Sequence, residues 1–142
     1  MTERKQEQNM RKPFLAGNWK MNTNSVTSVN LAAALAQDLA EINTVDVAVC
    51  PPFVYLQAVA AALTVSDIAV GAQDVYFEGN GAFTGEISCA MLKDCGCVYV
   101  ILGHSERRHI LGETDALINK KIRAAIQSGM LPIFCVGELL EQ

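Results

Sequence analysis

Polar residues that could do chemistry gather directly after a short apolar segment in the second half of the chain. Residues 98–102 read Val-Tyr-Val-Ile-Leu, a pattern typical of a strand buried on both faces. After Gly103 the chain carries five polar residues in succession, from His104 to Arg108. Because a buried strand cannot accommodate them, they must lie at or beyond its carboxyl end, where α/β folds build their sites. We expect His104 to face Lys20, which follows an earlier strand-like segment.

A lysine and a histidine at strand ends have a specific chemical use. The lysine can neutralise a phosphate or polarise a carbonyl as a point charge. The histidine begins a short helix whose dipole disfavours imidazolium, and a neutral imidazole could donate a hydrogen bond to a developing enolate. Taken singly, Lys20 could equally be a surface charge, His104 a turn residue, and residues 106–108 the solvated face of a helical turn. The other polar residues at strand ends are Asn18, Gln73, Glu106 and Glu138.

Composition and charge narrow the class of protein. The chain has 142 residues, of which 51% are hydrophobic and 18% are charged, and its net charge is −4. This suits one globular domain with elements buried on both sides, and it argues against a nucleic-acid surface. No apolar run approaches the roughly 18 to 20 residues of a membrane span, and the polar start lacks the apolar core of a secretory signal. We expect a disordered tail over 1–10, with Met10 as an alternative start, and one domain over 11–142.

The five cysteines indicate a reducing compartment. They form an odd set without a Cys-x-x-Cys motif, and three lie in or beside apolar segments, where free cysteine behaves as a small hydrophobic residue. Cys95 and Cys97 could instead form a metal or redox pair, but too few other ligand types lie nearby. We therefore expect reduced core cysteines, no metal site and a cytoplasmic location.

Apolar periodicity predicts alternating strands and helices. Strands are expected over 13–19, 45–50, 68–72, 98–102 and 131–136, and helices over about 25–41, 53–63, 88–94 and 114–128. The stripes expected to face the sheet are Leu31, Leu35, Leu39 and Ile42, then Phe53, Leu56, Ala60 and Leu63, and finally Ile118, Ile122 and Ile126. Alternation at about 30 residues per unit predicts parallel strands with the helices outside the sheet. An open doubly wound sheet and part of an eight-stranded barrel both fit this pattern.

Five short motifs occur in an order that points to one known family. They are Gly17-Asn-Trp-Lys-Met-Asn22, Gly71-Ala-Gln73, Gly81-Ala-Phe-Thr-Gly-Glu86, Gly103-His-Ser-Glu-Arg-Arg108 and Cys135-Val-Gly-Glu138. From Arg11 onward the sequence closely resembles the amino-terminal portion of the triosephosphate isomerase family, through its fifth strand. The resemblance implies an α/β fold, an incomplete (β/α)8 TIM barrel with about five parallel strands. It also implies a homodimeric enzyme of glycolysis and gluconeogenesis that interconverts dihydroxyacetone phosphate and glyceraldehyde 3-phosphate without metal or cofactor.

The resemblance also implies roles for individual residues. Asn18 and Lys20 would contact the small phosphorylated triose, with Lys20 supplying positive charge. His104 would be the catalytic electrophile that polarises the carbonyl, and Glu106 would be the supporting carboxylate near Lys20.

The longest connection would form the dimer interface. Residues 73–86 are rich in glycine yet carry three aromatic residues, so the segment must fold back onto the body or dock on something. In the family the equivalent loop inserts into the neighbouring subunit, which would place Gln73, Phe83 and Thr84 at the interface. Asp74 stands where asparagine is common, a departure expected to affect the interface more than the chemistry.

The sequence does not supply a catalytic base. The family's base is a glutamate after the sixth strand, and neither its motif nor the lid and phosphate-binding loops that follow occur here. Because a positioned base is worth roughly 10² to 10⁴ in rate, we expect an inactive, poorly soluble chain unless another chain complements it. Glu138 lies one strand short of the required position. The alternatives are a non-catalytic homologue that acts as an interaction module through residues 73–86, and an unrelated doubly wound phosphate-binding domain.

Overall fold

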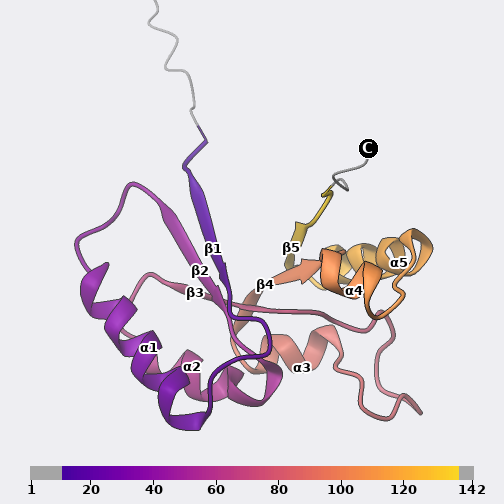
Figure 1. Cartoon of the computed structure of the whole chain (residues 1–142), viewed down its shortest axis with the longest axis horizontal. Coiled ribbons are helices and arrows are strands. Elements are labelled where there is room, and N and C mark those ends of the chain that lie inside the picture. Colours follow the sequence, from indigo (N-terminus) through magenta and orange to yellow (C-terminus); the bar gives the residue numbers. More distant parts are fainter. Residues whose placement is uncertain (1–10, 138–142) are drawn as a thin grey trace, which may run out of the picture.

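Five parallel strands lie side by side in chain order in the computed structural model, which describes residues 11–137. They are β1 (Phe14–Asn18), β2 (Asp46–Cys50), β3 (Ala69–Ala72), β4 (Cys97–Leu102) and β5 (Leu131–Phe134). Each strand pairs with the next, and the sheet curls like part of a barrel wall (Figure 1). A doubly wound sheet would reverse its strand order at a switch point, so the consecutive order confirms the incomplete barrel. The predicted tail and Glu138 lie outside the described residues.

Helices connect the strands and lie outside the curved sheet (Figure 1). They are α1 (Ser25–Asp38), the 3₁₀ turn η1 (Phe53–Tyr55), α2 (Leu56–Ala62), α3 (Cys89–Asp94), α4 (Ser105–His109) and α5 (Asp115–Gln127). Side-chain caps set where the two long helices begin. Asn24 accepts the N–H groups of Val26 and Thr27 in a capping box before α1, and Thr114 accepts that of Leu117 before α5. No helix within residues 11–137 combines the length and apolarity that a bilayer crossing requires.

The core lies between the outer face of the sheet and the helices. Its strand residues include Val49, Val70, Val100 and Leu102, and its helix residues include Leu56, Val59, Leu92 and Ala125. On the inner face, the rings of Phe14 and Tyr99 stack with their centroids 4.7 Å apart, which joins β1 to β4 across the curl. The predicted burial of cysteine is confirmed for Cys50, Cys89 and Cys97, and all five thiols are free.

The predicted apolar stripes are partly wrong. On α5, Ile118 is buried but Ile126 is 59% exposed, and Lys121 is buried instead. Residues spaced four apart advance about 40° per step around a helix, so a stripe of three drifts away from the face it starts on.

The stripe of α1 differs for another reason. Small residues let a helix approach its neighbours closely, so its buried face is centred on Ser28 and Ala32, while Leu31 is 41% exposed. The helix also ends at Asp38, so Ile42 lies beyond it. In the second stripe, Phe53 is exposed, whereas Leu56 and Leu63 are buried as predicted.

Candidate active site

The predicted site residues meet where β1 and β4 end. Lys20 follows β1, and its Nζ lies 2.7 Å from Oε1 of Glu106, which follows β4. Both strands are parallel, so their carboxyl ends lie on one edge of the sheet. A hollow of about 240 Å³ opens there, and its lining residues are Asn18, Lys20, Met21, Gln73, His104, Glu106, Arg107 and Leu111. The polar groups that the sequence placed after β1, β3 and β4 therefore share one concave surface.

The backbone of Lys20 is held in an uncommon conformation. Its φ is 54°, in the left-handed region that a residue with a side chain rarely adopts. The side-chain oxygen of Asn18 accepts the Lys20 N–H at 2.9 Å, and Nε2 of Gln73 donates to the Lys20 carbonyl at 2.8 Å. The same Gln73 nitrogen donates to the Cys50 carbonyl at the end of β2. Strain of this kind persists where surrounding contacts fix it, which is common at functional sites.

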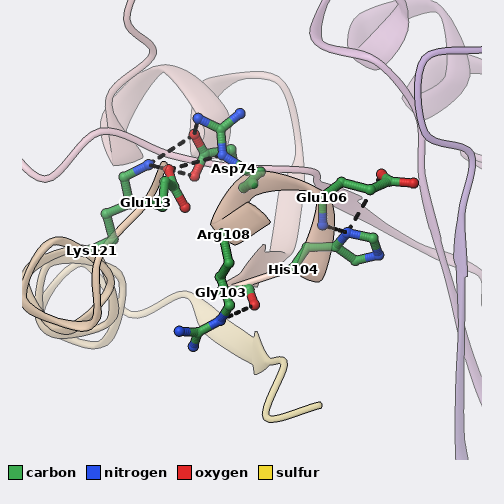
Figure 2. Close-up of polar contacts among 8 residues, drawn as sticks. Asp74, Gly103, His104, Glu106, Arg108, Glu113 and Lys121 are labelled. Atoms are coloured by element: carbon green, nitrogen blue, oxygen red, sulfur yellow. Dashed lines mark hydrogen bonds and ion pairs between the residues drawn. The ribbon is translucent and has the colours of Figure 1, made fainter. Parts of the chain in front are cut away.

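The imidazole of His104 has a defined hydrogen-bonding pattern. His104 is the N-cap residue of α4, and its Nδ1 accepts the backbone N–H of Glu106 at 3.2 Å (Figure 2). A nitrogen that accepts a hydrogen bond carries no proton, so in the neutral ring the proton lies on Nε2. The ring is therefore an Nε2–H donor in the wall of the hollow.

Glu106 completes the cluster as a carboxylate. A hydrogen bond from Lys20 holds the pKa of Glu106 below its usual value, with further lowering from the nearby charges. Its two carboxylate oxygens face both partners, with Oε1 2.7 Å from Nζ of Lys20 and Oε2 3.5 Å from Nδ1 of His104. Such a site combines a fixed cation, a neutral hydrogen-bond donor and the amide of Asn18, a set suited to binding an anion and polarising a carbonyl.

Comparison with known proteins agrees with this geometry. The family model described as triosephosphate isomerase matches residues 13–142. The chain belongs to the triosephosphate isomerase family. It is 59% identical over 133 residues to the triosephosphate isomerase of Carboxydothermus hydrogenoformans, covering 94% of this chain and 53% of the relative. It is 54% identical to that of Herpetosiphon aurantiacus, covering 92% of this chain and 52% of the relative.

A solved structure gives the same result for the fold. The crystal structure of triosephosphate isomerase from Bartonella henselae superposes with a TM-score of 0.86 at 38% identity, covering 92% of this chain and 54% of that one. The chain spans about half the length of the curated relatives it matches. The family resemblance is confirmed by these findings, while the roles of the individual site residues stay predictions.

Next to the candidate site lies a buried cluster of charges that the sequence analysis missed. Arg107 contacts Asp74 and Glu113, each at 2.9 Å. The ammonium of Lys121 donates to both carboxylate oxygens of Asp74 at 2.8 and 2.9 Å and also contacts Glu113 (Figure 2). Lys121 lies between Ile118 and Ile122 on the apolar face of α5, which was the available signal for its burial.

The protonation of this cluster follows from its burial and its two cations. Burial raises the pKa of Asp74 above its usual value, in opposition to the lowering by Lys121 and Arg107. For Glu113 burial also acts to raise the pKa, but the hydrogen bonds from Lys121 and Arg107 outweigh it, and the pKa of Glu113 is lowered. Asp74 is thus a buried partner in an internal ion network that adjoins α4.

The predicted interface residues lie on the connection between β3 and α3. The ring of Tyr76 contacts those of Phe77 and Phe83 at centroid distances of 4.5 and 4.9 Å, so the segment folds partly onto itself. Phe83 is nevertheless 38% exposed, and Thr84 is exposed. Gln73 uses its amide within the chain, so its place at an interface stays a prediction like those of Phe83 and Thr84.

Proposed function

We propose that this protein is an aldose–ketose isomerase that interconverts dihydroxyacetone phosphate and glyceraldehyde 3-phosphate. The observation that carries the proposal is that Lys20 and His104, whose neutral ring carries its proton on Nε2, line the same hollow. Membership of the triosephosphate isomerase family supports the same reaction. Within residues 11–137, no group of three or more His, Cys, Asp or Glu side chains could hold a metal ion. The proposed chemistry uses side chains of the protein.

Each site residue has a part in this reaction. Lys20 and Asn18 bind the triose, with the ammonium offsetting the charge of the phosphate and of the oxygen that becomes an enediolate. His104 donates from Nε2 to that oxygen, which is stabilisation of developing charge by a donor already in place. Glu106 holds the Lys20 ammonium, and its low pKa makes it a poor base.

The proton transfer between carbons needs a base that residues 11–137 do not place beside the imidazole. We propose that a carboxylate from outside these residues, on this polypeptide or a complementing one, abstracts the proton. Without it the site still binds a triose phosphate, but turnover falls by roughly 10² to 10⁴.

The test is isomerase activity of the protein, alone and with a complementing polypeptide that carries a glutamate after a sixth strand. H104Q should lower kcat by roughly 10² to 10⁴, the usual contribution of a positioned proton donor. H109Q is the matched control, because His109 is exposed on the same short helix, and it should behave like the parent protein. If H104Q and H109Q retained equal activity in the complemented enzyme, the assignment of His104 would be wrong.

A second copy of the chain is the partner that we propose for residues 73–86. Met21, Ile110 and Leu111 are 95%, 77% and 63% exposed, and Met21 and Leu111 line the hollow. This apolar rim could receive Phe83 and Thr84 of the neighbouring subunit. Sedimentation should then give a dimer that the substitution F83D dissociates, and a monomer at micromolar concentration would refute the assembly.

The alternative is a non-catalytic homologue that uses the same loop to bind another protein. The half-exposed aromatic cluster of the loop is the observation in its favour. A monodisperse protein that binds a partner but neither binds nor converts a triose phosphate would support this alternative. For the isomerase we propose a cytoplasmic location, because a charged phosphosugar does not cross a membrane unaided.

A further inference from the structure

Arg108 contacts the backbone on both sides of His104. Its side-chain Nε donates to the carbonyl of Gly103 at 2.6 Å (Figure 2), and its own backbone N–H donates to the carbonyl of His104 at 3.1 Å. These are the two carbonyl groups that flank the Cα of His104. The second bond is the i to i−4 backbone bond of α4, which any residue at position 108 would make. The arginine side chain adds the bond to the Gly103 carbonyl, which fixes the plane of the peptide that precedes His104.

Gly103 is shaped to receive this arginine. Its φ is 74°, and a Cβ built on it would lie 2.8 Å from Nη2 of Arg108 and 3.2 Å from the carbonyl oxygen of Cys135. A side chain there would therefore displace the guanidinium from the Gly103 carbonyl. The glycine serves both the left-handed turn at the end of β4 and the close approach of Arg108.

The guanidinium also ties this turn to the next strand. Nη2 of Arg108 donates to the Cys135 carbonyl at 3.4 Å, just past β5, and the guanidinium carbon lies 6.0 Å from the centre of the Phe134 ring. Arginine suits this position because its planar fork presents several donors in fixed directions. Nη1 of Arg108 lies 2.6 Å from Oδ1 of Asp115. The Asp115 side chain is 91% exposed, so this ion pair contributes little to stability.

We propose that Arg108 is a positioning residue that orients the imidazole of His104 through the backbone of Gly103. Its side chain holds the peptide plane before the histidine and fixes it against the end of β5. The Glu106 N–H then stays aligned with Nδ1, which leaves the proton of the neutral ring on Nε2. The catalytic consequence rests on the proposed isomerase function, whereas the orientation of the ring does not.

The first test uses ¹⁵N NMR of the two histidines in the intact protein above neutral pH, where turnover is not needed. The parent protein should show His104 as the Nε2–H tautomer. R108M, which keeps the apolar stem without donors, should lose this preference, and R108K, which restores one donor, should regain part of it. D115N removes the exposed ion pair alone and should leave the spectrum of His104 unchanged, with His109 as the internal reference.

The second test is kinetic and uses the active, complemented enzyme. R108M should lower kcat by about 10- to 100-fold, the effect of a displaced catalytic group, with KM little changed. An unchanged His104 tautomer in both R108M and R108K would overturn the positioning role, and R108K alone decides it if R108M does not fold. A changed tautomer in a protein that never converts triose phosphates would uphold the positioning role and refute the proposed reaction.

Discussion

The buried ammonium of Lys121 provides the sharpest test of how the site is supported. Its side chain is 3% exposed, and it contacts Asp74 and Glu113, whose side chains are 8% and 4% exposed. The substitution K121M keeps much of the side-chain volume but leaves two buried carboxylates to share Arg107. Removing one partner of a buried ion pair typically costs about 3–5 kcal/mol, because the charge left behind has lost its solvation. We expect K121M to lower the free energy of unfolding by this amount at neutral pH.

The loss should depend on pH with a definite sign. In the parent chain burial already raises the pKa of Asp74 in opposition to Lys121 and Arg107, whereas the hydrogen bonds from these two cations lower the pKa of Glu113. Without Lys121 the folded-state pKa of Asp74 rises further, and that of Glu113 rises above the unfolded value of about 4 because burial then outweighs Arg107. Groups with raised folded pKa values stabilise the protein below the unfolded pKa, and this contribution is lost as pH rises through the folded pKa. K121M should therefore be closest to the parent protein in mild acid and weakest at alkaline pH.

The assay is urea unfolding followed by circular dichroism at about pH 5 and about pH 8. The difference between the free energies of unfolding at the two pH values measures the coupling of stability to protonation. The double variant D74N/K121M removes one carboxylate together with the ammonium and should recover much of the loss at the higher pH. K120M, on the exposed neighbouring residue, controls for a change of net charge. A K121M loss below about 1 kcal/mol, the scale of a surface pair, would show that the network contributes no buried ion-pair energy.

Three further predictions concern Gly71, the buried cysteines of β2 and β4, and Gln73. G71A should lower the free energy of unfolding by about 1–3 kcal/mol in thermal melts, because the added Cβ would lie 2.7 Å from the sulfur of Cys50. G79A is the control and should leave the free energy of unfolding unchanged, because a Cβ there would have no atom within 4 Å. Burial raises the pKa values of Cys50 and Cys97 to about 12, so mass spectrometry should find both unalkylated by iodoacetamide in the folded protein and alkylated in urea. Q73E should lower the free energy of unfolding by about 1–3 kcal/mol in urea titrations at neutral pH, because a carboxylate cannot donate to the two carbonyls that Gln73 contacts. The loss should shrink in acid, where the carboxyl group is protonated and can donate.

The sequence was sufficient for the strands and for the polar residues Asn18, Lys20, Gln73, His104 and Glu106 that line the hollow, but not for Met21 and Leu111. Each strand lies within two residues of its predicted limits, because runs of β-branched residues bounded by Pro and Gly leave little freedom. Periodicity alone could not choose between a barrel and a doubly wound sheet, since both repeat the same βα unit. The five motifs predicted the barrel correctly through their resemblance to one family. Most of them place polar residues at the carboxyl end of a strand, where the site of a barrel lies.

What the sequence could not provide were the contacts between distant polar residues. The apolar neighbours of Lys121 on its helix hint at its burial, but Asp74 lies 47 positions away, so the carboxylates that the lysine meets cannot be identified without coordinates. The amide of Gln73 was assigned to an interface for a similar reason. A glutamine after a strand gives no sign that it will hold the carbonyl of Lys20, 53 residues earlier.

Each of the two groups proposed to act on substrate is held through its backbone by another polar side chain. Gln73, after β3, fixes the carbonyl of Lys20, and Arg108 fixes the Gly103 carbonyl that precedes His104. These bonds set the direction of each functional side chain without occupying its reactive end, which leaves the ammonium and Nε2–H available to a ligand. Loss of these bonds should therefore displace the functional groups as well as destabilise the chain, as expected for Q73E. Catalysis that depends on prearranged donors is sensitive to such displacement, so variants of both residues should also lower kcat.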